Sequence, residues 1–306
     1  MNFEMKNLIY RILVVALILA FSIIVVIASD DNIMSKENEE VVNSDEIFVK
    51  TSVNLPVLMY HHLADDADNE MTITPELFEE HIRTILANGY VPVSLEEVAF
   101  FVEGSGDLPE KPICITFDDG YLSNYEIAFP LLKKYNAKAA IAIVGTTVGA
   151  TTYKDTGVEI IPHFDFEHAK EMEESGLVSI ISHTYDMHQS ELLESGDEIR
   201  ISIGKLQNET EEEYERFLKK DFEKISSMIR ENLGKETIAV AYPRGVSDDV
   251  ANKIFKEAGV KITLATTNGI NKIEKGNLDS MYKLNRYTIG EHISCEELMR
   301  LLDIVK

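Results

Sequence analysis

The sequence predicts an α/β fold for residues 55–306, a distorted β/α barrel of about seven to eight strands. Short apolar runs alternate there with longer amphipathic stretches, which is typical of parallel strands joined by helices. Polar clusters directly follow several apolar runs, as in barrels whose sites lie at the carboxyl ends of the strands. An open, doubly wound sheet is the alternative, because this alternation does not reveal whether the sheet closes. A membrane segment is expected before the fold.

The predicted strands are short runs rich in β-branched, aromatic or other apolar residues. A nearly continuous apolar run such as 113–117 is typical of a core strand. In chain order, we expect strands at 56–60, 90–93, 113–117, 139–144, 178–182, 237–242, 262–266 and 282–289.

The predicted helices are the amphipathic stretches between these strands. Thr74 precedes Pro75 as an N-cap precedes a first helical residue, and Ser94 lies three residues before Glu97 in a capping-box arrangement. Gly259 is a typical helix stop. We expect helices at 75–88, 95–102, 125–135, 166–175, 211–233, 248–258 and 295–303.

Residues 1–29 differ in kind from the rest of the chain. Lys6 and Arg11 precede an uncharged, apolar run at 12–28, which predicts a signal anchor or a cleaved signal peptide. Both interpretations stay open. In either case the remainder is expected outside the membrane, anchored to it or secreted. Residues 30–54 are expected to form an acidic linker, and 55–306 the functional domain.

The charge and the cysteines exclude some classes of protein. The formal net charge of −24 argues against a nucleic-acid partner, because phosphate backbones attract basic surfaces. Cys114 and Cys295 do not resemble a disulfide framework, and we expect free thiols.

Two clusters of metal-binding residue types follow predicted strands. Asp118 and Asp119 end the run 113–117, and His183 and His188 follow the run 178–182. One aspartate and two histidines form a plausible ligand set for a divalent metal that keeps an open position for water. Two further clusters, 61–62 and 242–245, also follow predicted strands. Taken alone, each cluster is also compatible with an ordinary turn or a structural histidine.

These motifs resemble a known family. Ile115-Thr-Phe-Asp-Asp-Gly120 and Ser182-His-Thr-Tyr-Asp-Met-His188 are similar to the first two motifs of the polysaccharide deacetylase, or NodB-homology, family of metal-dependent carbohydrate esterases. Further segments resemble its extracellular branch that acts on poly-N-acetylglucosamine: 55–62, 88–90, 241–245 and 284–286. The resemblance implies a hydrolase that removes N-acetyl groups from a biofilm polymer or a cell-wall glycan.

The resemblance also implies roles for single residues. Asp119, His183 and His188 would bind the metal, with zinc as first choice and cobalt, nickel or manganese as alternatives. Asp118 would be the general base that takes a proton from the attacking water. The backbone N–H of Arg244 would stabilise the oxyanion, since Pro243 has no N–H.

The chain also departs from the family pattern. Ala241 stands where many relatives have an arginine that holds the base, and Arg244 where tyrosine or phenylalanine is common. Arg286 replaces the general-acid histidine expected in the last motif. We therefore consider His61 as the acid or as a group that orients the substrate. Tyr242 and Arg286 are expected to contact the substrate.

The sequence also allows two other functions to be considered for this fold. The departures slightly favour a catalytically weakened carbohydrate-binding or scaffold protein of the same fold, but the intact set of Asp118, Asp119, His183 and His188 opposes it more strongly. A glycosidase that uses Asp118 and Asp119 as its paired carboxylates is disfavoured, because sequence neighbours seldom flank a glycosidic bond.

Overall fold

The computed structural model describes residues 51–67, 69–194 and 198–303. The expected anchor or signal peptide at 1–29, and nearly all of the expected linker at 30–54, lie outside these residues. Within the described ranges, no helix combines the length and the apolar character needed to cross a membrane. The first strand, β1 (Ser52–Leu55), begins three residues before the predicted domain start, so the end of the predicted linker belongs to the fold.

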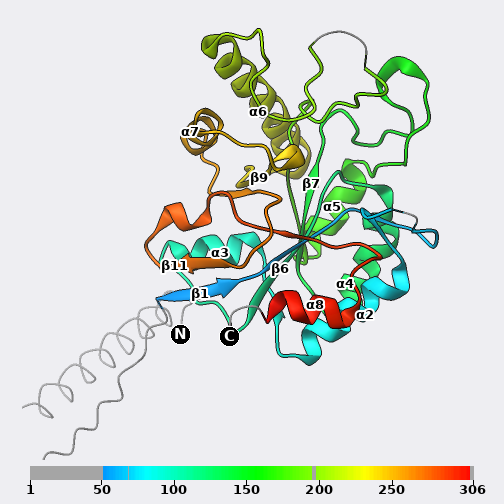
Figure 1. Ribbon diagram of the computed structural model, residues 1–306, viewed down its shortest axis with the longest axis vertical. Coiled ribbons are helices and arrows are strands. Elements are labelled where there is room, and N and C mark those ends of the chain that lie inside the picture. The colour runs from blue at the N-terminus through cyan, green and yellow to red at the C-terminus, as the bar shows by residue number, and fades with distance from the viewer. Residues whose placement is uncertain (1–50, 68, 195–197, 304–306) are drawn as a thin grey trace, which may run out of the picture. The chain divides into compact units, whose positions relative to one another are not determined.

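A parallel, curled sheet forms the centre of the fold (Figure 1). Its strands follow the order β10-β9-β8-β7-β6-β2-β12, and β5 pairs with β6. The α/β class is therefore confirmed. The strands are β2 (Val57–Tyr60), β5 (Val91–Pro92), β6 (Pro112–Phe117), β7 (Ala139–Ile143), β8 (Val178–Ser182), β9 (Ala239–Ala241), β10 (Ile262–Leu264) and β12 (Tyr287–Thr288).

The segment before β12 links the two edges of this sheet. The Leu284 amide donates to the Thr263 carbonyl at 2.8 Å, and the Leu284 carbonyl accepts from the Ala265 amide at 2.8 Å, so the segment lies along β10. Directly after it, β12 pairs in parallel with β2. The curled sheet is thus consistent with the predicted distorted barrel rather than with an open, doubly wound sheet.

Helices lie around the sheet at positions close to those predicted (Figure 1). Ser94 forms a capping box with Glu97, and Thr74 caps a helix that starts with Pro75, as expected. The helices are α2 (Pro75–Ala87), α3 (Leu95–Val102), α4 (Phe129–Tyr135), α5 (Phe166–Glu174), α6 (Glu211–Leu233), α7 (Asp249–Glu257) and α8 (Cys295–Leu302).

The predicted helix 125–135 is divided into two parts. A π-helical turn, η1 (Asn124–Ala128), precedes α4. Pro130 has no N–H, so the carbonyl four residues before it cannot receive the usual α-helical hydrogen bond, and the turn can widen there. The wider turn places Asn124 against the end of β2, where its side-chain amide donates to the His61 carbonyl at 2.7 Å.

Two pairs of short strands were not predicted. β1 pairs with β11 (Asn271–Glu274) in antiparallel orientation, and β3 (His62–Leu63) pairs with β4 (Thr72–Ile73). These short strands mix polar with apolar residues, so they do not appear as apolar runs in the sequence. In addition, the predicted strand 282–289 is reduced to β12, because Lys283 has a φ of 58°, which interrupts extended backbone.

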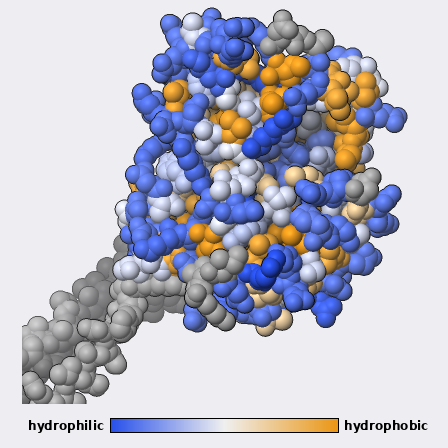
Figure 2. Space-filling model, viewed as in Figure 1, coloured by the Kyte–Doolittle hydropathy of each residue, from blue (hydrophilic) through white to orange (hydrophobic). Residues whose placement is uncertain are grey.

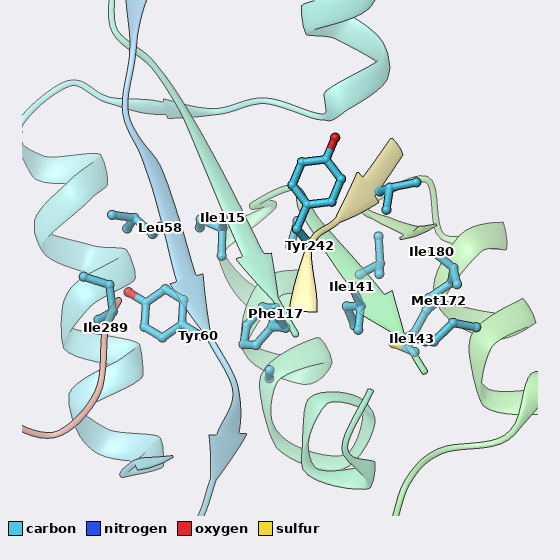
Figure 3. Packing of buried hydrophobic residues seen from close by; sticks show 14 of the residues in the cluster. Leu58, Tyr60, Ile115, Phe117, Ile141, Ile143, Met172, Ile180, Tyr242 and Ile289 are labelled. Atoms are coloured by element: carbon cyan, nitrogen blue, oxygen red, sulfur yellow. The ribbon is translucent and has the colours of Figure 1, made fainter. Parts of the chain in front are cut away.

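The side chains of the central strands alternate between two apolar clusters, as the two-residue period of a strand requires. Residues such as Leu58, Ile115 and Ile141 (Figure 3) point to the face covered by most of the helices, whereas α3 packs against the other face. Smaller residues such as Ala142 and Ala241 point to the opposite face. Asp118 directly follows β6 and His183 directly follows β8, so both lie at the carboxyl ends of their strands. The alternation along each strand places both side chains on this second face. On the surface, hydrophilic residues cover most of the face in Figure 2.

Candidate metal centre and active site

Asp119, His183 and His188 come together at the carboxyl ends of β6 and β8. One ligand atom of each lies within 4.8 Å of the others. Asp119 Oδ1 is 3.6 Å from His183 Nε2 and 3.5 Å from His188 Nε2. Ligands about 2.0–2.1 Å from a tetrahedral ion are separated by roughly 3.4 Å, so these distances fit a shared cation. Asp119 Oδ1 is also buried without a hydrogen-bond partner. The donor set therefore fits a divalent metal.

The backbone turns sharply at the aspartate pair. Asp119 and Gly120 have φ values of 74° and 81°, which are left-handed. Neighbouring residues of a regular strand point to opposite faces, so this turn allows both Asp118 and Asp119 to face the site. Gly120 is needed for a second reason, because a Cβ atom there would lie 3.0 Å from Ile143 Cγ2.

The surroundings of the two histidines favour metal binding. His183 Nδ1 donates to the Ala241 carbonyl at 2.8 Å, so Nε2, which lies 3.6 Å from Asp119 Oδ1, is the nitrogen available to a metal. Burial and the neighbouring His183 lower the pKa of His188 to about 4. The His188 imidazole is thus neutral at pH 7, as metal binding requires.

Asp118 lies beside this centre and is held by Arg286. The guanidinium donates from Nη1 to Oδ1 at 2.7 Å and from Nη2 to Oδ2 at 2.8 Å. The same guanidinium donates from Nε to the Ala265 carbonyl at 2.7 Å. Burial opposes ionisation of Asp118, but the charge of Arg286, with a smaller contribution from His183, brings its pKa below the ordinary value. Asp118 is therefore a carboxylate at neutral pH.

The position of Arg286 does not support the expected contact with the substrate. Its side chain is 0% exposed, and its donors are used within the protein. Arg286 instead supplies the guanidinium that Ala241 cannot, because its position at the sheet edge brings it to Asp118.

Tyr242 is also placed away from the site. Its side chain is 0% exposed, and its hydroxyl donates to Asn252 Oδ1 at 2.5 Å on α7. The ring belongs to the helix-covered cluster, two residues after Val240 on the same face. The expected substrate contact of Tyr242 is therefore not supported by its position.

A cavity of about 520 Å³ opens beside the metal-binding residues. Asp119, His188 and Arg244 line it, together with the loop 189–193. Arg244 has a φ of 55° in the turn after β9, and its exposed side chain pairs with Glu191 at 2.9 Å. The predicted oxyanion residue thus lies on the wall of the cavity that two of the predicted ligands, Asp119 and His188, also line.

His61 lies close enough to the two carboxylates to affect both. Burial raises the pKa of Asp119, but the imidazoles of His61, His183 and His188 lower it below the ordinary value. His61 Nδ1 is buried without a hydrogen-bond partner. Its neighbour His62, in contrast, bonds to Ser123 Oγ at 2.9 Å and is occupied within the fold.

Tyr121 and His163 are among the residues of the cavity wall that sequence reasoning missed. Their rings lie 4.9 Å apart, and His163 Nδ1 is buried without a partner. Tyr121 directly follows Asp118-Asp119-Gly120, so its place in the sequence could have indicated that it lies near the site. His163 lies in an irregular segment, and no sequence pattern connected it with the site.

Comparisons with known proteins agree with this geometry. The family model described as polysaccharide deacetylase matches residues 105–263. YxkH of Bacillus subtilis strain 168, a candidate polysaccharide deacetylase, is 28% identical over 249 residues, which cover 81% of this chain and 76% of that protein. The poly-β-1,6-N-acetyl-D-glucosamine N-deacetylase of Escherichia coli K12 is 24% identical over 263 residues, covering 81% of this chain but 38% of that enzyme.

A solved structure supports the same assignment. The de-N-acetylase from Aggregatibacter actinomycetemcomitans superimposes with a TM-score of 0.70 and 27% identity, over 81% of this chain and 99% of that one. The family that the motifs at 115–120 and 182–188 resemble is thereby confirmed. The chain belongs to the polysaccharide deacetylase family.

Proposed function

We propose that residues 55–306 form a metal-dependent N-deacetylase of a polysaccharide that contains N-acetylglucosamine. The observation that carries the proposal is the convergence of Asp119, His183 and His188 around one point, next to an ionised Asp118. The substrate class is supported by the relatives, among which the E. coli enzyme is named for poly-β-1,6-N-acetyl-D-glucosamine. A biofilm polymer and a cell-wall glycan are both compatible with the site.

Zinc is our first choice of metal, because two imidazoles and one carboxylate whose ligand atoms lie within 4.8 Å of one another suit it well. Cobalt, nickel and manganese accept the same nitrogen and oxygen ligands. When bound, such a cation polarises the acetyl carbonyl and lowers the pKa of a nearby water.

The residues around the cation would divide the remaining chemistry. Asp118 accepts a proton from the attacking water, whose oxygen forms a bond to the acetyl carbon. The backbone N–H of Arg244 donates to the carbonyl oxygen as it gains negative charge. The bond between carbon and nitrogen then breaks, and His61 donates the proton that the leaving nitrogen needs. The products are acetate and a free amine on the sugar.

The location is proposed from the sequence. Residues 1–29 carry the pattern of a signal anchor or a signal peptide, which would bring the domain to the extracytoplasmic side. A polymer outside the membrane would then be accessible to the cavity. The net charge of −24 makes nucleic acid an unsuitable partner.

Hydrolysis of defined oligomers tests this function. The zinc-loaded full chain is incubated with β-1,6-linked N-acetylglucosamine oligomers, with β-1,4-linked oligomers and with an O-acetylated glycan that carries no N-acetyl group. We expect acetate and primary amines to appear in equal amounts from an N-acetylated oligomer, and neither product after chelation. Acetate from the O-acetylated glycan alone would contradict an N-deacetylase.

One observation keeps a carbohydrate-binding or scaffold protein as the second candidate. Arg286 occupies the family's general-acid position and is fully engaged with Asp118 and Ala265, so it cannot protonate a leaving group. The same oligomers distinguish the two functions. Binding of an oligomer without release of acetate at any metal concentration would favour the binding protein.

A further inference from the structure

The loop between the two histidine ligands is bonded to a buried carboxylate on α6. Asp221 is 7% exposed. Its Oδ1 accepts from the Tyr185 amide at 2.8 Å, and its Oδ2 accepts from the Asp186 amide at 2.8 Å. Both carboxylate oxygens are thus used, and both bonds reach backbone that lies between His183 and His188.

This loop has limited means of fixing its own shape. The Met187 amide donates to Thr184 Oγ1 at 3.1 Å, a bond within the loop that does not attach it to the rest of the fold. Thr184 has a φ of 74°, so the chain reverses directly after His183. His188 lies beyond this reversal and outside β8, and its position depends on how the intervening backbone is held.

The loop after β7 forms hydrogen bonds to the carbonyls of the segment between the two histidines, but not to the Tyr185 and Asp186 amides. The Gly145 amide donates to the Thr184 carbonyl at 3.0 Å, and the Thr146 amide donates to the Tyr185 carbonyl at 2.9 Å. Asp221 approaches from another element, and it accepts from the amides. The two sets of bonds therefore restrain the loop from two elements of the fold.

The side chain of Asp186 adds a third restraint. Lys154 lies 2.8 Å from Asp186 Oδ1 and also pairs with Glu194 on the loop that lines the cavity. This interaction is partly exposed, so solvent weakens it. The buried, charge-assisted bonds of Asp221 are the stronger restraint, because carboxylate acceptors shielded from water form the stronger hydrogen bonds.

We propose that Asp221 is a positioning residue that fixes the separation of His183 and His188 and thereby increases the affinity of the site for its cation. The inference rests on the proposed metal-dependent function. Asp221 is not one of the candidate ligands. It acts through the backbone of Tyr185 and Asp186.

The metal affinity of variants at this position tests the proposal. Asp221→Asn retains the shape of the side chain but replaces one acceptor by a donor that opposes a backbone N–H, and Asp221→Ala removes both acceptors. Glu223→Gln and Glu223→Ala are matched controls, because Glu223 is an exposed acid on the same helix. We expect zinc affinity, measured by competition with a chelator, to fall about 10- to 100-fold in the Asp221 variants. The controls should bind as the unaltered chain does.

Two further readouts separate positioning from a general effect on folding. Deacetylation by Asp221→Asn should recover when excess zinc is added, since the metal then selects the competent loop conformation. Hydrogen exchange of the Tyr185 and Asp186 amides should be slow in the unaltered, metal-free chain and faster in Asp221→Asn. The exchange of the unaltered chain tests the bonds even if Asp221→Ala does not fold.

The outcomes distinguish this inference from the function on which it rests. Zinc affinity within about twofold of the unaltered chain in folded Asp221→Asn would overturn the inference alone. Activity that no zinc concentration restores would also overturn it. If the unaltered chain itself bound no divalent ion, the proposed function would fail, and this inference with it.

Discussion

Replacing Arg286 by methionine removes the partner of a buried carboxylate while keeping an apolar side chain of similar length. Arg286 and Asp118 have side-chain exposures of 0% and 3%. The change leaves Asp118 charged and buried, and it also leaves the Ala265 carbonyl without the donor that lies 2.7 Å away. Loss of one partner of a buried ion pair typically costs about 3–5 kcal/mol of unfolding free energy.

Urea denaturation at pH 7 measures the change in the free energy of unfolding. Urea is uncharged, so unlike guanidinium chloride it does not screen the ion pair. Arg230→Met is the matched control, because Arg230 also forms a two-bond ion pair, with Glu236, but on the surface. We expect the double variant Asp118→Asn/Arg286→Met to be more stable than Arg286→Met, since it contains no unpaired buried charge. The reasoning would be refuted if Arg286→Met were no less stable than Arg230→Met.

The same variant has a defined pH dependence. In the unaltered chain the pKa of Asp118 lies below its ordinary value, because burial, which raises it, is outweighed by the charge and hydrogen bonds of Arg286 together with the neighbouring imidazoles of His183 and His61. The pair therefore stabilises the fold above the ordinary pKa of aspartate, and this contribution is lost as the pH falls through the folded-state pKa. Without Arg286, burial raises the pKa, so the acid limb of the rate profile of Arg286→Met should move to higher pH. An unmoved limb would show that another group controls it.

Three further substitutions separate binding from catalysis. His188→Ala should abolish stable zinc retention, measured as metal per chain after gel filtration, because only two ligands remain. Full retention would show that other residues bind the metal. Asp118→Asn should retain zinc but lower the rate of acetate release at least about 100-fold, as loss of a general base does, and a normal rate would exclude that role. His61→Ala should lower turnover with zinc content unchanged, whereas an unaltered rate would remove His61 from the mechanism.

The arrangement of strands and helices was largely predictable, because most central strands lie in apolar runs that alternate with amphipathic helices. The helices α3 and α6 begin and end at the predicted residues, and both have capping boxes. The pairs β1–β11 and β3–β4 were not predictable in this way, because their short strands mix polar with apolar residues. Closure of the sheet depends on Leu284 bonding to a distant edge, and local sequence does not encode that contact.

The site was predictable to the extent that its residues follow strands. The convergence of Asp119, His183 and His188 agrees with their predicted role as ligands, although metal binding itself stays a prediction. The position of Tyr242 could have been predicted from its spacing from Val240, which places both on the helix-covered face. The pairing of Arg286 with Asp118 joins residues far apart in the chain, and no local pattern indicated it.

Acetate release as a function of bound zinc tests the central claim most directly. The full chain is first freed of metal and then titrated with zinc in the presence of an N-acetylglucosamine oligomer, while bound metal and acetate are measured in the same samples. The account predicts that the rate rises in proportion to bound zinc and stops rising at one ion per chain. A metal-free chain that releases acetate at the full rate would contradict it.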